Sequence, residues 1–184
     1  MQKEIFHSKK VVPGTLLYIE TKTLYESSFP AIEQVDFDWM TDQASKGLAE
    51  HRAYFDGEAF CGFTISLVSE RAVYLLFLAV DPHHHSKGYG SKILREMAEQ
   101  AKGRPLYLSI EPLDVTASNY AQRMRRLSFY ERNAYSLTDY LYYEDQEAYQ
   151  VMTTQPQAPI EDFVELAMRV EGSGMAIRVA QQEK

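Results

Sequence analysis

Nine consecutive apolar or aromatic residues, AVYLLFLAV at positions 72–80, form an uncharged run near the middle of the chain. A run of this length predicts a strand that is buried on both faces, and it is far too short to span a membrane. The strand should end at Asp81 and Pro82, because proline has no N–H to donate and restrains the residue before it. We therefore expect this strand at the centre of the fold.

A polar turn that contains Gly88 and Gly90 separates this strand from a helical pattern. Apolar side chains repeat along one face of the predicted helix, and charged side chains occupy the other. The apolar face comprises Ile93, Leu94, Met97, Ala98 and Ala101, and the charged face comprises Lys92, Arg95, Glu96 and Glu99. A strand, a glycine turn and a helix aim successive backbone N–H groups at one point, which favours the binding of an anion.

The N-terminal part of the chain predicts one strand and two helical segments. The pattern TLLYIET at 15–21 indicates a first strand after a Pro-Gly turn. Residues 24–29 indicate a short helical segment, and Pro30 ends or kinks it. A second helix is expected at 32–46, where apolar residues recur among polar ones.

A hairpin and a parallel strand surround the central strand in this interpretation. Alternating residues at 51–55 and 59–69 are joined through an Asp-Gly turn, which is a strong hairpin signal. Residues 106–110 predict a strand parallel to the central one, since a helical crossover connects the two.

The C-terminal half predicts a helix followed by an antiparallel pair. The helix covers about 119–133, with Ser118 or Asn119 as a possible N-cap, and the pair covers 140–143 and 148–154. The fold class is therefore mixed α/β, with a mostly antiparallel sheet, a central parallel strand pair, and helices on both faces.

The tail is expected to be an extension of the same domain. A connector rich in Gln and Pro precedes an amphipathic helical pattern from Ile160 to Met168, and a short strand is expected at 175–180. We assign 1–155 to one domain and 156–184 to a C-terminal extension packed on it. The alternatives are a dimer contact or a lid over a substrate site.

Composition narrows the function classes. The chain has 184 residues and a net charge of −7, which makes it a poor general binder of nucleic acid and compatible with a cationic substrate such as an amine. Its single cysteine, Cys61, excludes an internal disulfide and fits a reducing cytoplasm. The N-terminus has no hydrophobic signal-peptide core, so a cytoplasmic protein without membrane partners is expected.

The turn after the central strand carries a recognisable motif. It reads His85-Ser86-Lys87-Gly88-Tyr89-Gly90, after a strand end that reads Ala79-Val80-Asp81-Pro82. This resembles the acyl-CoA-binding motif of the GNAT superfamily of N-acetyltransferases, Arg/Gln-x-x-Gly-x-Gly/Ala after Val-x-Pro. Both glycines are in place, and His85 stands where the family has Arg or Gln. In the family the loop works mainly through main-chain amides, which bind the CoA pyrophosphate.

The predicted helix at 119–133 resembles the second motif of the same family, Asn-x-x-Ala-x-x-x-Tyr-x-x-x-Gly-Phe. Tyr130 falls on the tyrosine of the motif, Arg123 stands at the asparagine position, and Ala134 stands at the glycine position. The nearest asparagine, Asn119, lies one helical turn earlier. Glycine at position 134 would allow a left-handed helix end, which alanine resists.

The same helix is basic in an acidic protein. Its arginines are Arg123, Arg125, Arg126 and Arg132. The resemblance allows one or two of them to meet CoA phosphates, but we favour a solvated face. Rival phosphate motifs are absent from the sequence: there is no Walker loop, and Ile93 stands where a dinucleotide fingerprint needs its third glycine.

The resemblance implies an acetyl-CoA-dependent N-acetyltransferase of bacterial type that transfers acetyl directly to a primary amine. In the family the CoA arm pairs with a strand opened by a bulge. The residues that it assigns to CoA are Leu78, Val80, His85, Ser86, Lys87, Gly88, Tyr89, Gly90, Ser91, Asn119 and Arg123. A homodimer is possible, and the acceptor is a small-molecule or peptide amine that the sequence does not identify.

Two residues carry the expected chemistry. Tyr130 is the candidate that stabilises the departing thiolate, because a phenol with a pKa of about 10 stays protonated beside a thiol of about 8.5. Glu111, at the end of a strand, is the candidate base, and a structural role in the loop before Pro112 is the competing interpretation. No metal site is expected, since the adjacent His83, His84 and His85 rarely converge on one ion.

Two functions of other classes stay open at this point. One is a CoA-binding regulatory domain without catalysis, motivated by the departures at His85, Arg123 and Ala134. The other is an anion-binding module for nucleotides that does not bind CoA.

Overall fold

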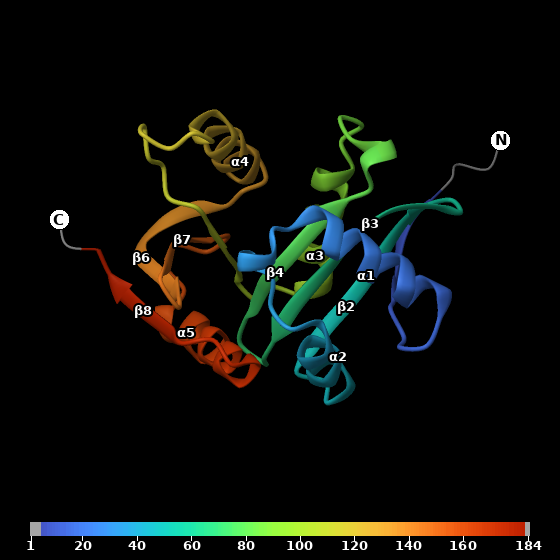
Figure 1. Ribbon diagram of the computed structural model, residues 1–184, viewed down its shortest axis with the longest axis horizontal. Helices are drawn as coiled ribbons and strands as arrows, with labels where there is room; N and C mark the ends of the chain where they lie inside the picture. The colour runs from blue at the N-terminus through green and yellow to red at the C-terminus, as the bar shows by residue number, and fades with distance from the viewer. Residues whose placement is uncertain (1–4, 183–184) are drawn as a thin grey trace. The chain divides into compact units, whose positions relative to one another are not determined.

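The computed structural model describes residues 5–182 and shows one eight-stranded mixed sheet with helices around it (Figure 1). The strand order is β1-β2-β3-β4-β5-β7-β6-β8, and β4 and β5 form its parallel pair. The strands are β1 Phe6–Lys10, β2 Ala49–Asp56, β3 Ala59–Val68, β4 Val73–Val80, β5 Leu106–Ile110, β6 Ser136–Glu144, β7 Glu147–Thr153 and β8 Ile177–Gln181. The predicted fold class is confirmed.

Five α-helices and three short 3₁₀ turns connect the strands among the described residues. The helices are α1 Leu16–Ser28, α2 Phe37–Ser45, α3 Tyr89–Ala101, α4 Tyr120–Arg132 and α5 Ile160–Met168. The turns are η1 Ala31–Glu33, η2 Pro82–His84 and η3 Arg169–Ser173. None of these described helices is both long enough and apolar enough to cross a bilayer.

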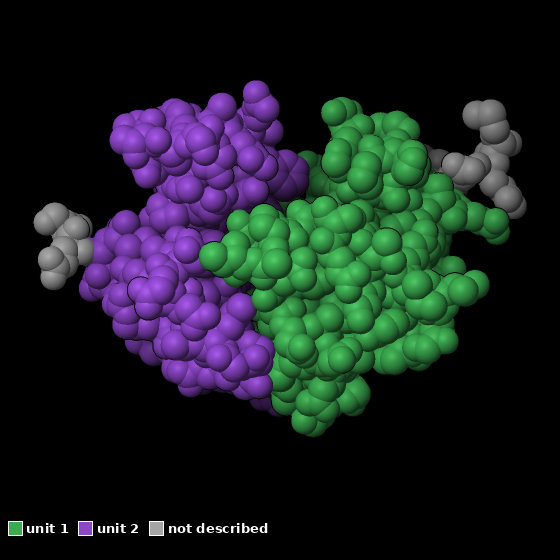
Figure 2. All heavy atoms as spheres, in the orientation of Figure 1, with its two compact units in different colours: residues 1–68, 75–102 green, residues 69–74, 103–184 purple. Residues whose placement is uncertain are grey.

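The chain divides into two compact units (Figure 2). Unit 1 comprises residues 1–68 and 75–102, and unit 2 comprises 69–74 and 103–184. Strand β4 contributes to both, because its first two residues belong to unit 2 and the rest to unit 1.

Unit 1 has an aromatic core on the sheet face that α1 and α2 cover. Tyr25 of α1 lies at its centre, with ring centroids 4.9 Å from Phe77, 5.2 Å from Phe37 and 6.4 Å from Phe63. Its hydroxyl donates to the carbonyl of Val35 at 2.8 Å, so the polar end of a buried ring is satisfied.

Helix α3 covers the opposite face of unit 1. Ile93, Leu94 and Met97 are buried as the helical pattern predicts, whereas Ala98, assigned to the same face, is exposed. Gln100 of α3 donates to Ser8 of β1 at 3.0 Å, which ties the helix to the edge of the sheet.

Unit 2 is an antiparallel layer of β5, β7, β6 and β8 that carries α4 and α5. Phe163 of α5 is fully buried, and its ring centroid lies 4.9 Å from Tyr74, 5.5 Å from Tyr107 and 5.9 Å from Tyr142. Arg71 pairs with Asp162 of the same helix at 2.8 Å. The tail after Pro156 therefore packs as part of unit 2.

The strand predicted at 15–21 is wrong, because this segment begins helix α1. Thr15 caps the helix by accepting a hydrogen bond from the N–H of Tyr18 at 3.3 Å. The apolar residues that suggested a strand, Leu16 and Ile19, are 85% and 60% exposed. The first strand is β1, whose sequence FHSKK is too polar to have been recognised as one.

The helix predicted at 32–46 is also shorter than expected. Asp36 caps α2 through the N–H of Trp39 at 2.6 Å, so the helix starts at Phe37 and only η1 precedes it. The hairpin, the strand at 106–110, the antiparallel pair and the tail helix are confirmed, with ends that shift by a few residues.

Candidate functional site

The turn between β4 and α3 is built by backbone and side-chain hydrogen bonds that run back to the end of the strand. The N–H of Asp81 donates to the carbonyl of Cys61 at 2.9 Å, and the carboxylate of Asp81 accepts from the N–H of His83 at 2.8 Å. The Nε2 of His85 donates to the carbonyl of Val80 at 2.9 Å. His85 therefore supports the turn through its side chain. Its ring bonds to the carbonyl of Val80, a main-chain group that we expect to face the CoA arm.

Six consecutive backbone N–H groups follow, from Ser86 to Ser91, and none has an acceptor among the described residues. The next N–H, that of Lys92, donates to the carbonyl of Gly88 at 3.2 Å and so begins the hydrogen bonding of α3. Ser86 and Gly88 have φ angles of +62° and +78°, which give the turn its tight curvature. Unpaired N–H groups at the start of a 13-residue helix are suited to an anion.

Gly62 of β3 allows the end of β4 to approach closely. A Cβ at this position would overlap the carbonyl oxygen of Ala79 and would lie 3.0 Å from the Cα of Val80. The close approach fixes the last residues of β4, from which the turn departs. Leu78 and Val80, assigned to CoA through their main chains, are half-buried there.

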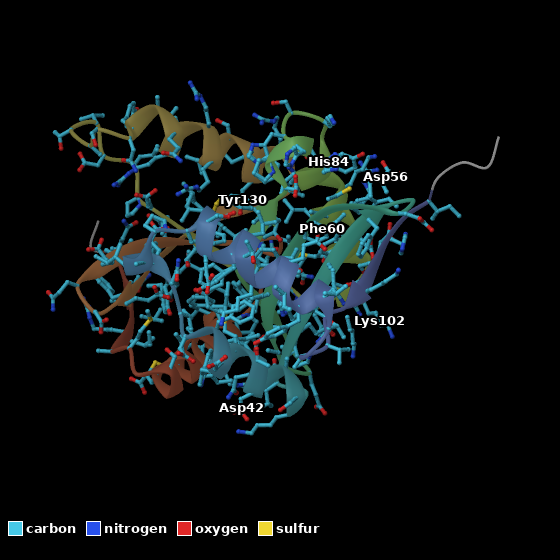
Figure 3. The ribbon with its side chains drawn as sticks, turned by 45° about the vertical axis from the view of Figure 1, so that its right-hand side comes forward. Asp42, Asp56, Phe60, His84, Lys102 and Tyr130 are labelled. Atoms are coloured by element: carbon cyan, nitrogen blue, oxygen red, sulfur yellow. The ribbon has the colours of Figure 1, made fainter. Side chains whose placement is uncertain are left out.

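Side chains on the other side of α3 hold its first turn in place. Asp56 lies at the end of β2 (Figure 3). It accepts from the hydroxyl of Tyr89 at 2.8 Å and from the ammonium of Lys92 at 3.2 Å. The hydrogen bond from Tyr89 is the main reason that the pKa of Asp56 lies below its usual range. The same bond raises the pKa of Tyr89 to about 12. The sequence predicts only a hairpin turn at Asp56, and nothing in the local sequence links this residue to Tyr89.

Lys87 and the histidines of the turn are engaged locally. The Nζ of Lys87 donates to the carbonyl of His83 at 3.1 Å, and the His84 ring lies edge-on to Tyr89 at 5.4 Å. The Nδ1 of His83 pairs with Asp81 at 2.9 Å. The three histidines point to different partners, and no three His, Cys, Asp or Glu residues within 5–182 are grouped so as to hold a metal ion.

In unit 2, Glu111 is the centre of a charged network between the end of β5 and α4. Its Oε1 accepts from the side-chain amide of Asn119 at 3.0 Å and pairs with Arg123 at 3.2 Å. Its Oε2 pairs with Arg126 at 2.6 Å. Arg123 also donates to Asn119 at 2.8 Å and to the carbonyl of Pro112 at 2.8 Å. The structure thus brings together Glu111, Asn119 and Arg123, which were predicted separately.

Two details of this network differ from the sequence interpretation. Asn119 does precede α4, but its side chain bonds to Glu111 and Arg123 and makes no cap. Arg126, expected on a solvated face, is 35% exposed and is ion-paired with Glu111. The family motif has alanine at this position, so the departure from the motif was the signal that sequence reasoning passed over.

Tyr130 lies one helical turn beyond Arg126 on α4. Its ring packs against Phe129 at 5.1 Å and Tyr135 at 5.6 Å, and its hydroxyl has no hydrogen-bond partner among the described residues. Burial raises the pKa of Tyr130 to about 12, against an opposing effect of the Arg126 charge. The phenol is therefore protonated and has an unused donor at neutral pH.

Helix α4 ends in a left-handed residue, as the glycine of the family motif would require. Ala134 has a φ of +68°, and its N–H donates to the carbonyl of Glu131 at 3.2 Å. The N–H of Tyr135 donates to the carbonyl of Tyr130 at 3.1 Å. These two bonds form a Schellman motif, here with alanine at the strained position.

A model of the acetyltransferase (GNAT) family matches residues 15–135, which include both motifs and the first four helices. The chain belongs to the GNAT acetyltransferase family. The match extends over both units and ends at Tyr135, so the GNAT family model does not cover the tail.

Solved structures of this family share the fold. A protein assigned to the GNAT family from Bacteroides thetaiotaomicron has a TM-score of 0.69 at 20% identity, over 86% of this chain and 92% of its own. A Bacillus subtilis acetyltransferase in complex with CoA has a TM-score of 0.57 at 14% identity, over 81% and 97%. A GNAT acetyltransferase from Elizabethkingia anophelis with acetyl-CoA bound has a TM-score of 0.57 at 12% identity, over 82% and 97%. No curated protein sequence matches the chain.

Proposed function

We propose that this protein is an acetyl-CoA-dependent N-acetyltransferase that transfers the acetyl group directly to a primary amine. The observation that supports it most is the run of six unpaired N–H groups from Ser86 to Ser91, which carries the acyl-CoA motif at the start of α3. Solved GNAT acetyltransferases of the same fold hold CoA or acetyl-CoA, in agreement with this cosubstrate.

The loop amides would bind the pyrophosphate, and the main chain of Leu78 and Val80 would hold the pantetheine arm. Holding the thioester beside the amine supplies much of the rate, because it replaces a bimolecular encounter by an oriented one. Lys87 would add its amide to the loop, and its ammonium would have to leave the carbonyl of His83 to reach a phosphate.

The reaction forms a bond between the amine nitrogen and the acetyl carbon and breaks the bond between that carbon and sulfur. The amine must attack as the neutral form, so its proton passes to a base, with Glu111 as our candidate directly or through water. The sulfur leaves as a thiolate, and the free hydroxyl of Tyr130 would donate a hydrogen bond to it. With a pKa of about 12, Tyr130 is a weaker acid than the thiol and stabilises the thiolate without having to be deprotonated.

The test is a free-thiol assay with acetyl-CoA and a library of primary amines, including small amines, lysine peptides and peptide N-termini. We expect thiol release that depends on the amine, with acetylated amine detected by mass spectrometry. The rival, a regulatory CoA-binding domain, predicts calorimetric binding of CoA with no thiol release on any amine.

We also propose that residues 156–184 form an extension of the acyltransferase domain assigned to 1–155. Its support lies in unit 2, where Arg71 pairs with Asp162 at 2.8 Å and with Glu165 at 2.7 Å. Deletion of 156–184 would expose the aromatic cluster around Tyr107, so we expect the truncated chain to be insoluble or strongly destabilised. A soluble truncated chain with the wild-type melting temperature would contradict this assignment.

A further inference from the structure

Arg126 has no counterpart in the family motif, and its position on α4 gives it a specific neighbour. It precedes Tyr130 by four residues, so the two side chains share one face of the helix. Arg126 is half-buried, and its positive charge lowers the pKa of Tyr130, which burial raises.

Glu111 holds this guanidinium in one place. Its Oε2 pairs with Arg126 at 2.6 Å, while its Oε1 accepts from Asn119 at 3.0 Å and pairs with Arg123 at 3.2 Å. The Glu111 side chain is 17% exposed, and that of Arg126 is 35% exposed. A carboxylate that serves three donors is well suited to orienting an arginine, and an arginine fixed in this way loses less conformational freedom when it meets a ligand.

We propose that Arg126, oriented by Glu111, stabilises the negative charge of the CoA thiolate beside Tyr130. This inference rests on the proposed function, because it assumes that the sulfur of CoA lies at the hydroxyl of Tyr130. Arg126 acts on the reacting sulfur through its charge. Glu111 is a positioning residue for Arg126, a role separate from that of candidate base for the amine. The carbon–sulfur bond breaks with its electron pair on sulfur, so a fixed positive charge lowers the energy of the transition state relative to the thioester.

The titratable groups around Arg126 within unit 2 determine the expected pH behaviour. Glu111 at the end of β5 pairs with Arg126 and also with Arg123, Tyr130 follows Arg126 by four residues on α4, and the ring of Tyr135 lies 5.6 Å from that of Tyr130. The pKa of Tyr130, about 12, lies well above the range from pH 7 to pH 9.5. The thiol of bound CoA is the group of the proposed site that should titrate in this range.

The direct test is the dissociation constant of CoA, without acceptor, measured by calorimetry between pH 7 and pH 9.5. A thiolate stabilised by Arg126 has a lower pKa in bound CoA than in free CoA, where the alkyl thiol titrates above the cysteine value of about 8.5. The affinity should therefore rise by up to about tenfold with pH. Desulfo-CoA has no thiol and should bind with no such rise. No amine is present in this measurement, so a base for the amine has no role in it. The measurement therefore separates the positioning role of Glu111 from its candidate role as the base.

Arg126→Gln should reduce the rise to less than about threefold, and Arg126→Lys should retain part of it because the charge remains. Glu111→Gln should reduce the rise as well, since the guanidinium is no longer held. The matched control is Arg169→Gln, which removes another arginine–glutamate pair of 2.9 Å to Glu165 but leaves α4 untouched, and it should keep the wild-type rise. With an active amine, Arg126→Gln should lower kcat about 10- to 100-fold with little change in KM.

Folding of each variant is checked by thermal melting. If Arg126→Gln alone is unstable, the double variant Glu111→Gln/Arg126→Gln is used, because it removes both charges of the pair together. A rise in CoA affinity with pH that keeps its wild-type size in Arg126→Gln or in this double variant would overturn the inference. So would a wild-type affinity that is independent of pH. Absence of CoA binding at every pH would instead contradict the proposed function itself.

Discussion

At the scale of single residues, the hydroxyl of Tyr130 differs from most tyrosine hydroxyls of the chain. Tyr107, for example, donates to the carbonyl of Pro159 at 3.1 Å, whereas Tyr130 has no partner among the described residues. A hydroxyl that stabilises no internal group can be removed at little cost in stability. Its contribution should therefore be seen in turnover.

Tyr130→Phe should lower kcat by roughly 10²- to 10⁴-fold, the range for loss of a catalytic proton donor, with the melting temperature unchanged. Tyr107→Phe is the matched control: it should keep kcat and lose about 1 kcal/mol of stability, because the hydrogen bond from its hydroxyl to the carbonyl of Pro159 is lost. Both variants are measured by thiol release and by thermal melting. Wild-type turnover in Tyr130→Phe, when the chemical step limits the rate, would remove this residue from the mechanism.

Ala134 carries backbone strain that the sequence predicts. Its φ of +68° is a conformation that costs a non-glycine residue about 1–2 kcal/mol, and the hydrogen bonds of the Schellman motif hold it there.

Ala134→Gly should increase the free energy of unfolding by about 1 kcal/mol, because glycine adopts this conformation without strain. Ala98→Gly, in the exposed interior of α3, should decrease it by about the same amount through helix propensity. Urea denaturation of both variants measures the increase and the decrease in the free energy of unfolding. A loss of stability in Ala134→Gly would show that the left-handed helix end is not populated.

At the scale of elements, β4, the turn and α3 are the part that the sequence predicts best. An uncharged run, a proline and two glycines leave few alternatives, and the observed β4 Val73–Val80 and α3 Tyr89–Ala101 follow from them. The failure at α1 has a physical cause: its buried residues, Thr21, Leu24 and Tyr25, follow helical spacing, but Leu16 and Ile19 face solvent and imitate a strand. The links from Asp56 to Tyr89 and from Glu111 to Arg126 join residues far apart in sequence, so no local pattern could predict them.

Gly88→Asp should raise the KM for acetyl-CoA at least tenfold, because a carboxylate in the loop repels the pyrophosphate. Gly14→Asp is the matched control, since Gly14 and Gly88 have φ angles of +81° and +78° and open space at the Cβ position. Both substitutions impose similar backbone strain, so a stability loss alone should appear in both. Equal KM values for the two variants would contradict the assignment of the loop to the pyrophosphate.

At the scale of the whole molecule, His51 makes stability depend on pH. It is 7% exposed, its ring lies 5.6 Å from Phe37 and 5.8 Å from Phe63, and burial lowers its pKa to about 4. The unfolded chain takes up a proton at His51 near pH 6.5, while the folded chain does so only near pH 4. Stability is therefore lost as the pH falls between these values.

From pH 7.5 to pH 5 this residue should cost about 2 kcal/mol of unfolding free energy. His51→Phe should remove that part of the pH dependence, because it has no group to protonate. Urea denaturation at both pH values in the wild type and the variant measures it. If the wild type and His51→Phe lost the same unfolding free energy between pH 7.5 and pH 5, the assignment of this pH dependence to His51 would be contradicted.

The central claim is that the amides from Ser86 to Ser91 bind the pyrophosphate of CoA. A titration of the ¹⁵N-labelled protein with CoA, followed by amide NMR, tests it most directly. We predict saturable shifts at these six amides that inorganic pyrophosphate reproduces at higher concentration, and that Gly88→Asp weakens. Binding of CoA that leaves these six amide resonances unchanged would contradict the account.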